Sequence, residues 1–281
     1  MRRLPPFLLL LAASACSHAS TLPPAAALHN DEGVRALREG DLETADHQLN
    51  LALEYAPDFV EALVNLGLVE LERGNFERAR VLLQRARRRQ PDVAEPHHGL
   101  GVLAEREGDL EEAEVCYREA LRVDPGFLPA RMALARLYYD AGLLEAARVE
   151  FGRATAAAPE DAEVAAGLAQ ALMSLGRDED AGRVIRGAQS AGGAPALTLA
   201  SARLLLKSGE LGEARRRLEQ LSVEQPELRA ARLAWLAVIE LAERQPVKAE
   251  QLATEALGIY PAESVARWVL RHRERESDGV K

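Results

Sequence analysis

Apolar residues along this chain return in two helical patterns that alternate. In residues 60–72 they recur at the spacing of one helical face, and a second such pattern follows in residues 76–89. Gly74 lies between the two patterns, where glycine can cap the first helix in the left-handed conformation. Pro91 ends the second pattern, because proline lacks the N–H and clashes one turn back. The pattern therefore predicts two helices joined by a tight turn.

This helix pair recurs about every 34 residues, in three columns of small residues and prolines that stay in phase. A lone helix pair cannot bury its apolar stripe, whereas stacked pairs can, so the repeat predicts one elongated all-α array. The columns are Gly40, Gly74, Gly108, Gly142, Gly176 and Gly209; Ala45, Ala79, Ala113, Ala147, Ala181, Ala214 and Ala249; and Pro57, Pro91, Pro125, Pro159, Pro226 and Pro261.

The spaced small and apolar positions resemble the tetratricopeptide repeat family. The second unit carries them as Leu66, Gly67, Gly74, Phe76, Ala79, Leu83, Ala86 and Pro91, and the fourth as Leu134, Ala135, Tyr138, Gly142, Leu144, Ala147, Phe151, Ala154 and Pro159. The resemblance implies a right-handed α-solenoid of about seven helix pairs plus a C-terminal capping helix. Two departures stand out: Gly193 replaces a proline, which predicts a looser joint near residues 190–195, and Arg244 and Pro246 replace a glycine and an apolar residue.

The columns place the boundaries of the units. We predict an array over residues 28–261, with units at about 26–59, 60–93, 94–127, 128–161, 162–194, 195–229 and 230–261. Residues 262–276 are predicted to form the capping helix, and residues 277–281 a disordered tail. One face of the capping helix would hold Val265, Trp268, Val269 and His272.

The first residues have the pattern of an export signal, with Arg2 and Arg3 before a short apolar run. Residues 1–15 resemble the signal peptide of a bacterial lipoprotein, which implies lipidation of Cys16 and a tether over residues 16–27. Ala13 departs from that family, which usually has leucine there, and an ordinary signal peptidase could instead cut after Ala15. Ser17 resembles the outer-membrane sorting signal. The predicted location is the periplasmic face of the outer membrane, with a soluble periplasmic protein as the alternative.

Composition and motifs argue against several functions. The formal net charge of −9 predicts no general affinity for nucleic acid. Cys116 has no disulfide partner if Cys16 is lipidated, and the adjacent His97 and His98 point about 100° apart on a helix, so they predict no metal site. The sequence has none of the common catalytic or phosphate-binding motifs. We therefore expect no enzyme activity, no cofactor and no small-molecule substrate.

Two basic runs, Arg85 to Arg89 and Arg215 to Arg217, lie toward the ends of second helices. Cations there favourably face the carbonyl end of the helix dipole, and each such contact contributes up to about 1 kcal/mol. Contact with an anionic lipid or an acidic partner is the alternative function of these runs.

In the tetratricopeptide family the first helices line a concave groove. Transferred by position, that resemblance predicts a groove in which contiguous apolar residues mark a partner site. The alternative is that several of them, especially Leu71, Tyr139 and Leu206, pack between adjacent units. The predicted groove residues are Val64, Leu68, Leu71, His98, Val102, Glu105, Met132, Arg136, Tyr139, Ala166, Gln170, Met173, Leu199, Arg203 and Leu206.

These features together predict a non-enzymatic scaffold, tied to a membrane by a lipid, that holds an apolar helix or extended segment of a partner protein. The plan of a lipoprotein signal followed by such repeats resembles pilotin-type lipoproteins, which help to assemble the secretin of type IV pili. It also resembles lipoproteins of motility and cell-wall machines. The alternative is an accessory regulator of a periplasmic cell-wall enzyme.

Overall fold

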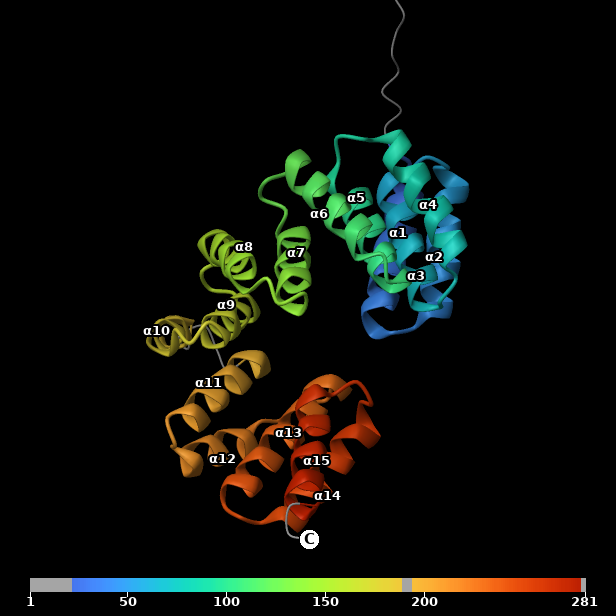
Figure 1. The fold of residues 1–281 in the computed structure, drawn as a ribbon. Coiled ribbons are helices and arrows are strands. Elements are labelled where there is room, and N and C mark those ends of the chain that lie inside the picture. The colour runs from blue at the N-terminus through green and yellow to red at the C-terminus, as the bar shows by residue number, and fades with distance from the viewer. Residues whose placement is uncertain (1–21, 189–193, 279–281) are drawn as a thin grey trace, which may run out of the picture. The chain divides into compact units, whose positions relative to one another are not determined.

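The computed structural model describes residues 22–188 and 194–278, and within them every regular element is a helix (Figure 1). This confirms the predicted all-α fold, in which helices pack pairwise. The helices are α1 (Pro24–Glu39), α2 (Leu42–Tyr55), α3 (Val60–Glu72), α4 (Phe76–Arg89), α5 (Ala94–Glu107), α6 (Leu110–Val123), α7 (Leu128–Asp140), α8 (Leu144–Ala157), α9 (Ala162–Ser174), α10 (Asp178–Ala188), α11 (Pro195–Lys207), α12 (Leu211–Gln220), α13 (Pro226–Ala242), α14 (Pro246–Ile259) and α15 (Ser264–Asp278).

The chain divides into two compact units. Unit 1 ends at Pro91 and contains α1–α4, and unit 2 begins at Asp92 and contains α5–α15. In unit 1 α1 packs on α2 and α3 packs on α4, while the contact of α2 with α3 joins the two pairs. Unit 2 repeats this scheme, with α6 against α7 and α8 against α9 between its pairs. Within each unit, every first helix after the unit's first pair is thus held by its own second helix and by the preceding one.

Six glycines of one column make the turns inside the pairs. Their φ angles lie between 75° and 83°, in the left-handed region that side chains disfavour. In the last pair the same place is taken by Arg244, with φ 59°, and Arg244 is the one non-glycine residue of positive φ among those that the structure describes. The turn predicted from the glycine column therefore forms even where the glycine is missing.

The small residues of the first helices allow close approach of the second helices. A Cβ atom on Gly67 would lie 2.8 Å from Cγ of Leu83, and one on Gly101 would lie 2.6 Å from Cδ1 of Tyr117. Leu83 and Tyr117 are both completely buried. The facing residue therefore fills the space that a side chain on the glycine would need.

The fifth proline of the column, Pro226, does not end a helix. Pro57, Pro91, Pro125, Pro159 and Pro261 each follow the end of a second helix by two residues, but Pro226 is the first residue of α13, and α12 has already ended at Gln220. The seventh pair consequently begins four residues before the predicted boundary at 230. Proline fits both places, because the first helical position needs no N–H donor.

Both ends of the described chain are more helical than predicted. α1 begins at Pro24 and buries Ala26, so residues 24–27 belong to the first helix and not to the tether. α15 extends to Asp278, which corrects the predicted disorder of residues 277–278. Among residues 264–272, whose side chains the structure describes, Ala266 and Val269 are completely buried.

The predicted face of this capping helix is buried only in part. Trp268 and His272 share it as predicted and stack with 4.8 Å between ring centroids, but Trp268 is exposed, whereas Val269 is buried. The predicted signal peptide, Cys16, most of the tether, the joint at residues 189–193 and the tail at 279–281 lie outside the described residues. Among the described helices, none is both long and apolar enough to cross a bilayer.

Candidate partner-binding surface

The first helices α5, α7, α9 and α11 of unit 2 carry most of the predicted groove residues, and the side of unit 2 that these side chains form is called here the inner face. It contains a hollow of about 310 Å³, built mainly from α7 and α9. The hollow brings together Met132, Arg136, Tyr139, Ala166 and Gln170 as predicted. It also has lining residues that the prediction did not include: Asp140, Phe151, Glu163, Gly167 and Ala196.

The charged rim of this hollow has both signs. Arg136 is exposed and forms no hydrogen bond or ion pair with any residue that the structure describes. Burial raises the pKa of the Asp140 carboxyl, and the charge of Arg136 opposes this shift. Glu163 adds an exposed carboxylate from α9. An apolar floor with an unpaired guanidinium at its edge is suited to a peptide that brings both an apolar and a polar group.

A polar cluster joins four first helices beside the hollow. Tyr139 Oη of α7 lies 2.9 Å from Ser174 Oγ at the end of α9. Arg203 of α11 donates to both hydroxyls, from Nη1 to Tyr139 Oη at 3.5 Å and from Nη2 to Ser174 Oγ at 3.4 Å. Its guanidinium also lies over the ring of Trp235 in α13, 5.8 Å from the centroid. The four residues hold successive repeat pairs together on the inner face.

The predicted residues of α5 form an aromatic contact and not an open surface. The half-buried ring of His98 lies 5.8 Å from that of Tyr117 and 5.6 Å from that of Phe127, centroid to centroid. Burial among these rings lowers the pKa of His98 to about 4, so the imidazole is neutral at pH 7. Tyr117 donates a hydrogen bond to Glu105, and burial raises the pKa of its phenol. Val102 packs against the buried core cluster that contains Tyr117.

Several predicted partner-binding residues expose little of their surface to solvent. Val64, Met173 and Leu199 expose 6%, 2% and 6% of their area, so they contribute packing and not a binding surface. Met132 is 8% exposed, but that part lines the hollow. Leu68 is half-buried and lies with Val64 in unit 1, so it is described apart from the inner face of unit 2.

Most charges in the two basic runs are used within the protein. Arg85 and Arg89 both pair with Asp58, at 3.1 and 2.9 Å. Arg215 pairs with Glu240 and Glu243, each at 2.7 Å. These ion pairs, and not only the helix dipole, balance much of the positive charge in both runs.

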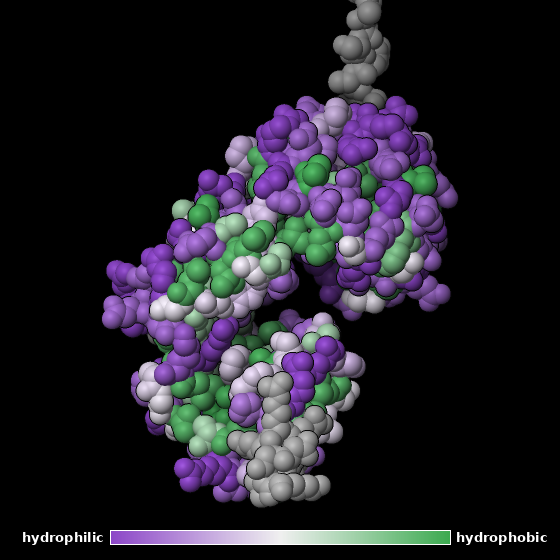
Figure 2. Space-filling model, viewed as in Figure 1, coloured by the Kyte–Doolittle hydropathy of each residue, from purple (hydrophilic) through white to green (hydrophobic). Residues whose placement is uncertain are grey.

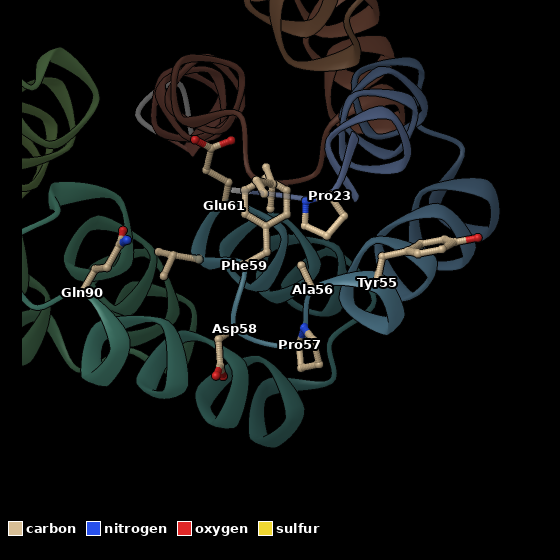
Figure 3. A pocket seen from close by; sticks show the side chains of 10 residues that line it. Pro23, Tyr55, Ala56, Pro57, Asp58, Phe59, Glu61 and Gln90 are labelled. Carbon is tan, nitrogen blue, oxygen red and sulfur yellow. The ribbon is translucent and has the colours of Figure 1, made fainter. Parts of the chain in front are cut away.

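Unit 1 has a hollow of its own that the sequence did not predict. It measures about 640 Å³ and lies where the start of α1 meets the turn between α2 and α3. In Figure 3 the side chain of Tyr55 points away from Phe59, and Asp58 and Gln90 lie at the rim. Tyr55 instead stacks on His29, with 5.7 Å between centroids.

Comparison with known proteins agrees with the repeat fold. Three family models, each described as tetratricopeptide repeat, match residues 58–125, 104–166 and 199–264. The chain is a tetratricopeptide repeat protein. No curated protein matches its sequence.

Solved structures resemble this tetratricopeptide repeat protein at low identity. A tetratricopeptide repeat protein of Parabacteroides merdae is 17% identical, with a TM-score of 0.66 over 90% of this chain and 100% of the other. PilF of Pseudomonas aeruginosa is 22% identical, with a TM-score of 0.58 over 76% of this chain and 97% of the other. PilW, a type IV pilus biogenesis factor, is 19% identical, with a TM-score of 0.56 over 88% and 99%. At such identities the likeness shows the fold alone.

Proposed function

We propose that this chain is a scaffold that binds a segment of a partner protein on the inner face of unit 2. The observation that carries the proposal is the hollow between α7 and α9. Met132 and Ala166 line its floor, and Arg136 lies at its rim without an ion pair to any described residue. Apolar surface of this kind, rimmed by polar groups, is typical of partner sites. Tetratricopeptide proteins generally work as scaffolds.

A charge reversal tests this surface. We expect the double variant Arg136→Glu and Gln170→Glu to capture at least about tenfold less partner, because it replaces the rim cation and adds charge beside the apolar floor. The measurement is photocrosslinking in cells from a photoreactive residue at position 136 or 102 in otherwise unchanged protein, followed by pull-down of the identified partner. Lys248→Glu, on the second helix α14, is the matched control and should bind normally. Equal capture by the folded double variant would contradict the proposal.

We also propose that Cys16 is lipidated and anchors the scaffold to the outer membrane. The supporting observation is the sequence of residues 1–17, an apolar run and small residues before a cysteine, with serine after it. Metabolic labelling with a palmitate analogue should mark the wild type and not Cys16→Ser. A soluble, unlabelled periplasmic protein would support ordinary export instead.

For the machine that the scaffold serves, we propose an envelope assembly complex such as the type IV pilus secretin or a motility complex. The support is the lipoprotein plan together with the fold that the chain shares with PilW and PilF. Co-purification from solubilised envelope should recover secretin or motility subunits. Recovery of cell-wall synthases or hydrolases would instead indicate the regulatory role.

A further inference from the structure

A second hollow of unit 2 lies between the second helices α8 and α10 and is separate from the inner face. It measures about 480 Å³ and shares no lining residue with the inner hollow. Leu168 and Leu172 of α9 and Val184 of α10 supply its apolar side chains. Figure 2 shows apolar residues at the surface over the α7–α9 part of this unit. The proposed function leaves this α8–α10 hollow unused.

The hollow is open because one side chain is absent. Gly152 lies within α8, and a Cβ placed on it would meet no atom within 4 Å. One repeat earlier and one repeat later the same place is Arg118 and Arg186, whose long side chains would fill such a space. A glycine inside a helix is destabilising relative to alanine, and here no close approach of another helix requires it.

The rim of the hollow is basic in an acidic protein. Three arginines and one aspartate line it, a net charge of +2, whereas the whole chain carries −9. Asp180 accepts a hydrogen bond from Arg177 Nε at 2.7 Å and another from Arg183, whose side chain is 73% exposed. Each guanidinium has five donors, so a single carboxylate cannot satisfy both arginines. Arg148, on the opposite side, pairs with Glu145.

We propose that the α8–α10 hollow binds an acidic segment of a partner protein. A leucine or phenylalanine of that segment would fill the space beside Gly152 and contact Leu168 and Leu172. Flanking aspartate or glutamate residues would accept hydrogen bonds from Arg183 and Arg148. The lining joins a rim of net charge +2 to three apolar side chains, and this suits a protein segment that carries both acidic and apolar residues.

A selection on the immobilised full chain tests both parts of the proposal. The probe is a displayed library of random 12-residue peptides, selected against wild type, Gly152→Trp and Gly258→Trp. Gly258 lies within α14 and also has open space around it, so Gly258→Trp is a matched control. We expect peptides that combine Asp or Glu with Leu or Phe, and at least tenfold lower recovery on Gly152→Trp alone. Gly152→Gln fills the hollow without a new apolar surface and should act like Gly152→Trp.

The charge requirement and the membrane alternative are tested separately. The double variant Arg148→Glu and Arg183→Glu should lose the acidic peptides at least tenfold while Arg136→Glu, on the inner face, retains them. Failure to enrich acidic peptides, or equal recovery on wild type and both Gly152 variants, would overturn the proposal. So would sedimentation with phosphatidylglycerol vesicles that Gly152→Trp abolishes, because a lipid would then occupy the hollow. None of these outcomes depends on partner capture at the inner face.

Discussion

Glycines in these helices occupy two opposite environments, and single substitutions distinguish them. Gly101→Ala should lower the free energy of unfolding by about 1–2 kcal/mol, because its methyl would lie 2.6 Å from Cδ1 of Tyr117. The ring cannot move away easily, since Tyr117 is completely buried and hydrogen-bonded to Glu105. The overpacking exceeds the gain of about 1 kcal/mol in helix propensity. Urea unfolding followed by circular dichroism measures the change.

Gly152→Ala is the matched control for Gly101→Ala. Both glycines lie inside helices, but nothing approaches the Cβ position of Gly152 within 4 Å. At Gly152 only the higher helix propensity of alanine acts, so the substitution should raise the free energy of unfolding by up to about 1 kcal/mol. If both variants shift stability in the same direction, the close packing of Gly101 on Tyr117 is not the cause.

His98 makes stability depend on pH. Burial lowers its pKa from 6.5 to about 4, so between these values the unfolded state binds more protons than the folded state. Stability is therefore lost as the pH falls through this window. Between pH 7.5 and pH 5 the wild type should lose up to about 2 kcal/mol more than His98→Gln, measured by urea unfolding at both pH values. Parallel pH profiles of the two proteins would show that the imidazole is not desolvated in the folded state.

The sequence could identify which positions face inward, but not how deeply each residue is buried. The positional pattern of the family placed Met132, Arg136 and Tyr139 on the groove, and these three residues line one hollow. The same pattern included Met173 and Leu199, which neighbouring side chains cover. Periodicity reports the direction of a side chain on its own helix. Exposure also depends on the residues of adjacent helices, and a single-helix pattern does not contain them.

At the scale of the helix pair, the turn between α13 and α14 is the strained one. Arg244 adopts φ 59°, where six other pairs have glycine. Arg244→Gly relieves a left-handed conformation that costs about 1–2 kcal/mol but makes the unfolded chain more flexible. We expect a net gain of about 0.5–1 kcal/mol in the free energy of unfolding, measured by thermal and urea denaturation.

The reverse substitution supplies the control for Arg244→Gly. Gly74→Ala places a side chain at φ 77°, where nothing lies within 4 Å, so only backbone strain opposes it. It should cost about 1 kcal/mol. A destabilised Arg244→Gly would indicate that the arginine side chain, and not its backbone, stabilises this turn.

The glycine column was enough to predict all six glycine turns, whereas the proline column misplaced one helix boundary. A glycine of positive φ has one use at the end of a helix. Proline both ends helices and begins them, so Pro226 alone could not show that α12 stops at Gln220 and that residues 221–225 connect it to α13. Deciding between these readings needs the packing of Leu221, which is buried against the neighbouring core.

At the scale of the molecule, the stability of a repeat array is close to a sum of pair stabilities and contacts between neighbours. Within unit 2 Arg203 goes beyond this scheme, because it bonds to Tyr139, 64 residues earlier in the chain. The guanidinium also contacts Ser174 and the ring of Trp235, so one side chain touches three other repeat pairs. The coupling between the stabilities of repeat pairs on the inner face should therefore depend on the side chain of Arg203.

Arg203→Ala and Tyr139→Phe should prove coupled in a double-mutant cycle. We expect an interaction free energy of about 0.5–1.5 kcal/mol, typical of a hydrogen bond between residues in contact. Hydrogen exchange should also become faster in α11 and α13 of Arg203→Ala, while α5 and α6, which the side chain does not touch, keep their protection. Arg229→Ala, at an exposed arginine of α13, should change neither measurement. Strict additivity of the two substitutions would mean that the repeat pairs of unit 2 behave as nearest neighbours only.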